Sequence, residues 1–424
     1  MGKLQQALAY IEAGNIDKGL TLLSELEKDA NEDLMYILAE AYYELGHLEK
    51  AHKIIDQLLD IYPNDGELLA YKAELLIDLD NEDEAINLLT DINEDDPAYL
   101  KAQLLLADLY QMQGFDEVAE QKLLKVNELV PDDPHVAFAL GDFYLSRSDY
   151  HKSIPYFKQL YYDEENAGMF HKGEIELKLA EAFSGIGEFE EALEFYEKGL
   201  KEKTQIHALF QYGYIAFQLE RYDVAIKQFQ KLKELEPNYA GLYPYLAKCF
   251  EAKDMLDEAL KTLKEGMEID EFNEALYVHA AKLCFKKQDP KSGEKFLKQV
   301  IQLNPSFFEA IRTYAAFLKH EERYQDLLQL IEKYKETGEE DPLIVWYEAY
   351  CLHKEEEFEK AKERFSEAYK YFANDPDFLE DYSLFFLENG YKKDALEMME
   401  KALQIDGSKH HLQEMAVQLQ EEIY

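Results

Sequence analysis

One spacing of apolar and small residues repeats along almost the whole chain, and its clearest copy runs from Glu32 to Asp65. In this copy two sets of residues follow helical spacing, first Met35, Leu38, Ala39 and Tyr42, then Ala51, Ile55 and Leu58. Each set forms the apolar face of one helix, Gly46 stands between the two sets, and Pro63 follows the second. The stretch therefore predicts two amphipathic helices joined by a tight turn.

The same order of residues recurs at a period of about 34 residues, and in this it resembles the tetratricopeptide repeat family, whose unit is a helix-turn-helix. Small residues such as Ala39 and Ala51 have counterparts in nearly every copy, and they divide the chain into about twelve units. The resemblance implies an all-α fold, a right-handed α-solenoid superhelix in which the first helix of each unit lines the concave groove. The tenth unit departs from the pattern, because Leu327 stands where a small residue is expected.

The phase of the repeats suggests four segments. Residues 1–167 are predicted to form an N-terminal array of five repeats, and the five residues Gly168–Lys172 interrupt the period as an insertion and candidate hinge. Residues 173–409 are predicted to hold repeats six to twelve. Residues 410–424 have helical apolar spacing and polar residues between, so we expect a capping helix that shields the last repeat.

The chain is strongly acidic, with 45 Lys and Arg against 88 Asp and Glu and a formal net charge of -43. Such a surface repels phosphate groups, so nucleic acid is not an expected partner and protein or peptide segments are. The first residues lack the apolar core of a signal peptide, and no stretch is long and apolar enough to insert directly into a membrane. We expect a cytoplasmic protein of bacterial type.

No arrangement of side chains in the sequence indicates catalysis or metal binding. The acidic run Asp78, Asp80 and Glu82 lacks the glycine and the final glutamate of a calcium loop. Histidines show no ligand spacing, and the three cysteines Cys249, Cys284 and Cys351 lie far apart. We therefore predict no catalytic residues, no metal site, no cofactor and no enzyme activity.

The resemblance implies that positions 2, 5, 9, 12 and 13 of each repeat face the groove. In repeats two to six these positions are mostly acidic, with a predicted acidic groove at Glu40, Glu74, Asp108, Asp142 and Glu181. In repeats seven to eleven they are basic and aromatic, with a predicted partner-binding groove at Phe210, Tyr214, Phe217, Tyr245, Lys248, Lys282, Lys286, Arg312, Lys319, Trp346 and Tyr350. The signs are segregated, whereas random placement would mix them.

These positions favour a non-enzymatic scaffold or adaptor that binds partner proteins in its groove, an acidic segment in the basic part and a basic segment or second partner in the acidic part. An alternative is a regulatory sensor that binds a peptide and compacts its superhelix. A third interpretation is that the charged residues only solvate a wide groove. The aromatic residues also leave self-association open.

Overall fold

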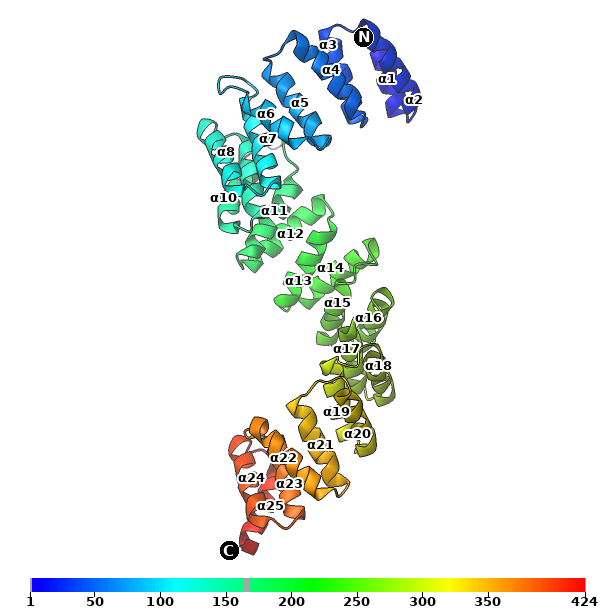
Figure 1. Ribbon diagram of the computed structural model, residues 1–424, viewed down its shortest axis with the longest axis vertical. Coiled ribbons are helices and arrows are strands. Elements are labelled where there is room, and N and C mark those ends of the chain that lie inside the picture. Colours follow the sequence, from blue (N-terminus) through cyan, green and yellow to red (C-terminus); the bar gives the residue numbers. More distant parts are fainter. Residues whose placement is uncertain (1, 164–167, 424) are drawn as a thin grey trace. The chain divides into compact units, whose positions relative to one another are not determined.

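The structure is a computed structural model that describes residues 2–163 and 168–423, and within these ranges it contains helices and no strand (Figure 1). Its residues divide into two compact units, 1–208 and 209–424, called here the N-terminal and C-terminal units. The helices of the N-terminal unit are α1 (Gly2–Glu12), α2 (Ile16–Leu26), the short 3₁₀ helix η1 (Glu27–Asp29), α3 (Glu32–Glu44), α4 (Leu48–Ile61), α5 (Gly66–Asp78), α6 (Glu82–Thr90), α7 (Tyr99–Met112), α8 (Asp116–Leu129), α9 (Pro134–Ser146), α10 (Tyr150–Tyr162), α11 (Lys172–Gly185) and α12 (Phe189–Glu202).

Helix α13 begins just before the division between the units, and the other helices of the C-terminal unit follow it. They are α13 (Ile206–Gln218), α14 (Tyr222–Leu235), α15 (Leu242–Ala252), α16 (Leu256–Ile269), α17 (Glu274–Lys286), α18 (Pro290–Leu303), α19 (Phe308–His320), α20 (Tyr324–Lys335), α21 (Pro342–Lys354), α22 (Phe358–Phe372), α23 (Pro376–Glu388), α24 (Lys392–Ile405) and α25 (His410–Ile423). Of the helices in the described ranges, each is too short or too polar to cross a membrane.

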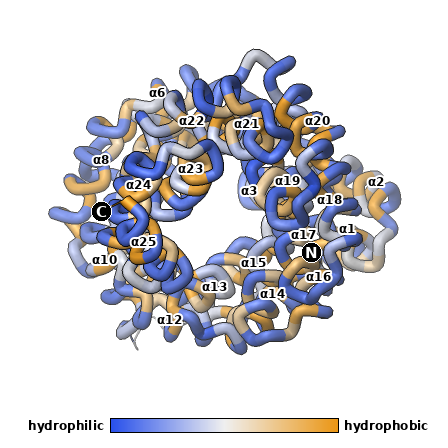
Figure 2. Tube along the Cα trace, turned by 90° about the horizontal axis from the view of Figure 1, so that it is seen from below, coloured by the Kyte–Doolittle hydropathy of each residue, from blue (hydrophilic) through white to orange (hydrophobic). Residues whose placement is uncertain are grey.

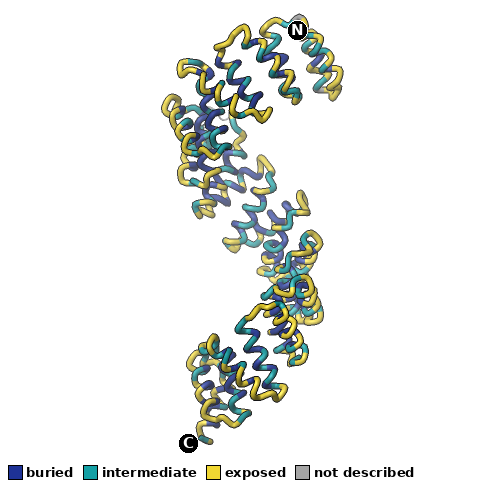
Figure 3. Tube along the Cα trace, in the orientation of Figure 1, coloured by how far each residue is buried: buried dark blue, intermediate teal, exposed yellow. Residues whose placement is uncertain are grey.

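The predicted all-α solenoid is confirmed, because in the described part of the chain α1 to α24 form twelve consecutive pairs and α25 follows them. The two helices of a pair contact each other, and within each unit first helices also contact across repeats, as α5 does α7 and α19 does α21. Figure 2 shows hydrophobic and hydrophilic residues alternating along single helices, and Figure 3 shows the inter-helix turns exposed and the helix interiors buried. Each pair therefore buries its apolar faces mainly against its neighbours in sequence.

Several first helices begin at an Asp-Pro pair. The carboxylate of Asp133 accepts hydrogen bonds from the backbone N–H groups of His135 and Val136 at the start of α9, and Asp375 accepts two in the same way at the start of α23. Proline fits the first helical position because its missing N–H has no partner to lose there. These pairs set where the first helices of repeats five, eleven and twelve begin, Asp341 doing so at α21.

The small residues that mark the repeats lie where two helices approach most closely. A Cβ atom built on Gly213 would lie 2.8 Å from the ring of Phe229, and one on Gly141 would lie 2.9 Å from Phe157. A larger side chain at these sites would push the two helices of the pair apart. Leu327, the departure noted in the sequence, is fully buried in its repeat rather than excluded from it.

The turn inside every pair requires a backbone conformation that favours glycine. The residue at this turn has positive φ in all twelve repeats: it is Gly14, Gly46, Gly114, Gly187 or Gly390 in five of them and Asp80, Ser148, Glu220, Asp254, Gln288, Glu322 or Glu356 in seven. Residues with a Cβ atom are strained in this region by about 1–2 kcal/mol. Seven repeats therefore hold a strained turn.

The predicted insertion lies within the N-terminal unit, between α10 and α11, and not at the division between the units. The ring of Phe170 stacks on Phe138 of α9, with 4.6 Å between ring centroids. His135 of the same helix contacts it edge-on at 5.5 Å. The segment is thus attached to its neighbouring repeat, and its role as a hinge stays a prediction; the predicted array boundary at residue 167 lies outside the described residues.

A charged contact joins the ninth and tenth repeats. Glu294 of α18 accepts two hydrogen bonds from the guanidinium of Arg323, at 2.9 and 3.0 Å, and one from the hydroxyl of Tyr314 at 2.7 Å. The Arg323 hydrogen bonds, with Lys298 and Tyr314 beside them, lower the pKa of Glu294 to about 2. The contact is thus strongest while this carboxyl group is ionised.

We predict that Ser148→Gly raises the free energy of unfolding by about 0.5–1 kcal/mol, because glycine relieves the strain of φ 61° at this turn without changing the charge. Gly114→Ala, at the same turn of the preceding repeat, should lower the free energy of unfolding by about 1 kcal/mol. A Cβ atom added there would meet no other atom within 4 Å, so the cost comes only from the backbone strain. Urea unfolding of the full chain measures both. Equal effects of the same sign would contradict the argument.

We predict that the Glu294 contact is lost in acid. Its folded pKa lies below the unfolded value near 4.5, so its stabilisation is complete above that value and declines as the pH falls from there toward 2. Relative to Glu294→Gln, the wild type should be more stable by about 1–2 kcal/mol at pH 7, since solvent screens part of the contact. Urea unfolding at falling pH should show this difference shrinking; a constant difference would refute the assignment.

Candidate functional site

The predicted aromatic residues of the seventh and eighth repeats gather into one cluster in the C-terminal unit. Tyr245 of α15 lies at its centre, with its ring centroid 5.0 Å from that of Tyr214, 5.7 Å from Phe217 and 6.0 Å from Phe210. The last three residues come from one face of α13, and all four rings are half-buried. Burial, with Tyr214 beside it, raises the pKa of Tyr245, so its hydroxyl stays protonated. The cluster is a partly open apolar surface with hydroxyl groups.

A large cavity lies farther along the same unit, over the first helices α17, α19 and α21. Its volume is about 1060 Å³, and it is lined by Lys282, Phe285, Gln288, Pro290, Glu309, Arg312, Thr313, Ala316, Phe317, His320, Glu321 and Tyr347. The rings of Phe285 and Phe317 stack with 4.7 Å between their centroids. Predicted site residues Lys282 and Arg312 thus meet at a surface with an aromatic component. A cavity of this size holds several side chains of a peptide.

Most of the predicted basic residues are already paired with acidic groups. Lys282 contacts Glu309 at 2.7 Å, and Lys286 contacts Glu251 at 3.5 Å. Within the described part of the chain, Lys248 and Arg312 have no ion pair. Lys248 is exposed, and its ammonium lies 5.5 Å from the centroid of the Tyr245 ring. Among the predicted basic residues of the groove, Lys248 and Arg312 therefore carry the positive charge that the described residues leave unpaired.

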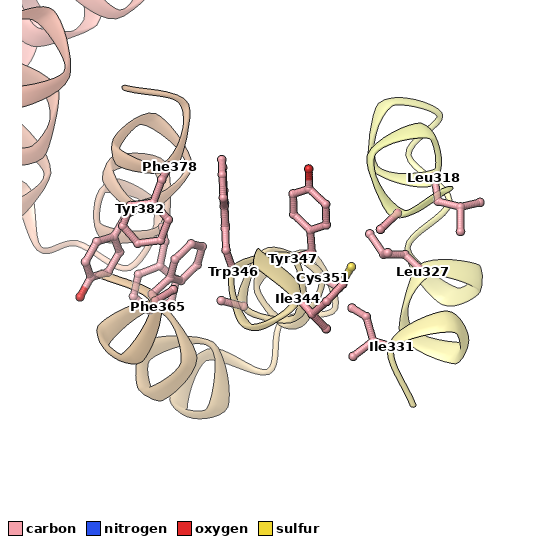
Figure 4. Close-up of a cluster of buried hydrophobic side chains, with 14 of the residues drawn as sticks. Leu318, Leu327, Ile331, Ile344, Trp346, Tyr347, Cys351, Phe365, Phe378 and Tyr382 are labelled. Carbon is pink, nitrogen blue, oxygen red and sulfur yellow. The ribbon is translucent and has the colours of Figure 1, made fainter. Parts of the chain in front are cut away.

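Two predicted site residues, Trp346 and Lys319, do not face an open groove, and this part of the prediction needs correction. The Trp346 side chain is 6% exposed, its ring lies 5.4 Å from Phe378, and its indole N–H donates to Asp381 at 2.8 Å. Figure 4 shows it projecting from α21 beside Phe365, Phe378 and Tyr382.

Lys319 forms an ion pair with the same carboxylate, Asp381, and its side chain is 21% exposed. Its ammonium lies 4.8 Å from the ring centroid of Trp346 and 4.5 Å from that of Tyr350, which is half-buried. Burial raises the pKa of Asp381, and Lys319 with Trp346 opposes this effect. Lys319, Trp346 and Asp381 are therefore packing partners that join repeats ten, eleven and twelve.

The predicted acidic residues are spread along the N-terminal unit. Glu74 pairs with Lys101 at 2.9 Å, and Asp142 pairs with Lys178. Burial, with the charge of Asp142 nearby, raises the pKa of Asp108. Glu181 lines a small cavity of about 140 Å³, and Glu40 is exposed. Two of these five carboxylates, Glu74 and Asp142, are therefore neutralised within the fold, and the acidic groove stays a prediction.

The predicted site left out the three aromatic residues that line the cavity, Phe285, Phe317 and Tyr347. Phe285 occupies a position of its repeat that faces the groove. Its position and its aromatic side chain together are therefore a signal for it in the sequence. Phe317 and Tyr347 occupy other positions, and they reach the cavity because neighbouring first helices lie against each other. No spacing within one repeat indicates such a contribution.

Comparisons with known proteins find tetratricopeptide repeats along the chain. Models of YpiA-like tetratricopeptide repeats match residues 111–165, and models of YpiA-like C-terminal tetratricopeptide repeats match residues 342–408. A general tetratricopeptide repeat model matches residues 10–75. The chain is 41% identical to the TPR repeat-containing protein YpiA of Bacillus subtilis (strain 168), over 99% of this chain and 98% of that protein.

Similar solved structures include YrrB, described as a TPR protein with an unusual peptide-binding site. It is 17% identical, with a TM-score of 0.40, and the match covers 45% of this chain and 97% of YrrB. Yeast Tom70 is 15% identical, with a TM-score of 0.38, and the match covers 99% of this chain and 95% of Tom70.

We predict that Lys319→Met lowers the free energy of unfolding by about 2–4 kcal/mol, because it leaves the buried carboxylate of Asp381 without its cation. Lys248→Met removes the same charge from an exposed side chain of the same unit and should change stability by less than about 0.5 kcal/mol. Urea unfolding of both variants at neutral pH tests this. If the two variants were equally stable, Lys319 would not be a packing residue.

Proposed function

Because the chain belongs to the family of YpiA-like tetratricopeptide repeat proteins, we propose that it is a non-enzymatic scaffold that holds a partner protein on the inner face of its C-terminal unit. Tetratricopeptide repeats generally serve as protein-interaction modules, since stacked first helices present a long surface. The partner segment is acidic and carries at least one large apolar side chain. The protein acts in the cytoplasm.

The observation that carries this proposal is the cavity over α17, α19 and α21. Stacked aromatic rings of Phe285 and Phe317 provide apolar surface, and Arg312 beside them has no ion pair among the described residues. Arginine and aromatic residues are the types that dominate binding energy at protein interfaces. A large apolar side chain would lie against the rings, and a neighbouring carboxylate would pair with the guanidinium.

A second aromatic surface, the cluster around Tyr245, lies on the first helices α13 and α15 of the same unit. Lys248 lies next to it, with its ammonium over the Tyr245 ring, so a second cation stands beside a second apolar patch. The pattern of aromatic patch and unpaired cation thus occurs twice in one unit. This arrangement suits a partner segment that carries two acidic groups and two large apolar side chains.

We predict that the double variant Lys248→Glu/Arg312→Glu loses its partner. Affinity capture from the source organism's extract, with mass spectrometry of the bound proteins, should identify a protein that binds the wild type and not this variant. With that protein purified, calorimetry should show an affinity weaker by about tenfold or more, since two like-charge contacts replace two favourable ones.

The control is Lys291→Glu/Lys295→Glu, which makes the same change of charge at exposed positions of the second helix α18. This variant should bind the partner within about twofold of the wild type. Equal loss in both variants would mean that only total charge matters, and identical capture by all three proteins would overturn the proposal.

A further inference from the structure

Three tyrosines and a row of carboxylates lie together in the N-terminal unit, on the first helices α3 and α5. Tyr36 and Tyr43 lie on one face of α3, about two helical turns apart, and Tyr71 of α5 packs against both. The ring centroid of Tyr71 is 5.8 Å from that of Tyr36 and 5.9 Å from that of Tyr43. Tyr36 and Tyr43 are half-buried, and Tyr71 is 6% exposed, so Tyr71 forms the floor of the cluster.

The charges around these rings are negative. Glu40 of α3 and Glu74 of α5 lie near both Tyr36 and Tyr71, and burial with these charges raises the pKa values of both phenols. A hydrogen bond with Asp78 raises the pKa of Tyr43 to about 12. All three hydroxyl groups therefore stay protonated, and the cluster carries only the charge of its carboxylates.

These carboxylates are not fully neutralised by the fold. Lys101 pairs with Glu74 at 2.9 Å. In the described ranges, Glu40, Glu44 and Glu67 have no ion pair, and all three are exposed. Carboxylates held together without cations repel one another, so a bound cation would relieve this repulsion.

The hydroxyl group of Tyr71 lies in the same cluster and also lacks a partner among the described residues. The hydroxyl oxygen of Tyr71 is fully buried, and within the described part of the chain it has no hydrogen-bond partner. A buried hydroxyl group without a partner costs about 1–3 kcal/mol. Its nearest charged and aromatic neighbours are those of the cluster itself, Glu40, Glu74, Tyr36 and Tyr43. An incoming hydrogen-bonding group would satisfy this hydroxyl once a ring that covers it, such as that of Tyr36 or Tyr43, turned aside.

We propose that this tyrosine-carboxylate cluster is a second binding site, one that takes an arginine side chain from a basic segment of a partner protein. A guanidinium is planar, so it stacks on a tyrosine ring while its N–H groups reach carboxylates at the edge. It also donates in several directions at once, to carboxylate and phenol oxygens alike. A lysine ammonium carries the same charge but has no planar group that could stack on a tyrosine ring.

The site is independent of the proposed function of the C-terminal unit, because its residues all belong to the N-terminal unit and its preferred partner has the opposite charge. Four of its residues, Tyr36, Glu40, Tyr43 and Glu44, occupy groove-facing positions of a single repeat. The protein would thus distinguish basic from acidic segments by where along the chain they bind.

Calorimetry of the full chain with a blocked peptide of alternating glycine and arginine tests the proposal, with the matched glycine-lysine peptide beside it, both at low salt. The arginine peptide should bind about fivefold more tightly than the lysine peptide. Tyr36→Leu and Glu40→Gln should each weaken arginine-peptide binding about threefold or more, whereas Tyr36→Phe, which keeps the ring, should retain it. Far-ultraviolet circular dichroism confirms that each variant is folded.

The matched charge control is Asp60→Asn/Glu128→Gln, two exposed carboxylates on the second helices α4 and α8 of the same unit. It should leave arginine-peptide binding within about twofold of the wild type. Equal binding of the two peptides, or equal loss in the charge control, would overturn the assignment and leave general electrostatic attraction. If Tyr36→Leu bound the arginine peptide as tightly as the wild type, stacking of the guanidinium on the Tyr36 ring would be excluded.

Discussion

Every repeat of this protein depends on one residue that reverses the chain direction between its two helices. That residue adopts positive φ in all twelve repeats, whether or not it is glycine. The helix pair cannot close without it, because the second helix must return within a few residues to bury its apolar face against the first. Seven repeats meet this requirement with a residue that is strained there. Packing between the two helices is therefore strong enough to hold an unfavourable backbone conformation.

Neighbouring repeats neutralise much of each other's charge, and this decides which residues are available to a partner. Glu309 and Glu251 pair with Lys282 and Lys286, so a surface that is basic by residue count is nearly neutral at those points. Arg312 remains unpaired beside aromatic rings. Unpaired charge next to apolar surface, rather than the density of charge, is what distinguishes a binding surface from a solvated one.

The fold could be predicted from the sequence because helical spacing, small contact residues and turn residues all agree with one repeat. The site could be predicted only in part. Repeat position tells in which direction a side chain leaves its helix, and in the structure Phe210 and Tyr214 do lie together while Arg312 lines the cavity. It does not tell whether the next repeat covers that side chain. Asp381 lies two repeats beyond Lys319, and it turned a predicted binding residue into a packing residue.

Contacts that lie mainly between neighbouring repeats also affect how the chain folds during synthesis. A polypeptide leaves the ribosome from its N-terminus, and a pair such as α3 and α4 meets its packing partners as soon as the adjoining pair emerges. In the described ranges, the helices pack against helices that are close in the sequence and not against helices from the distant end of the chain. Synthesis and folding can then advance together, and little apolar surface stays open to aggregation while a chain of 424 residues is completed.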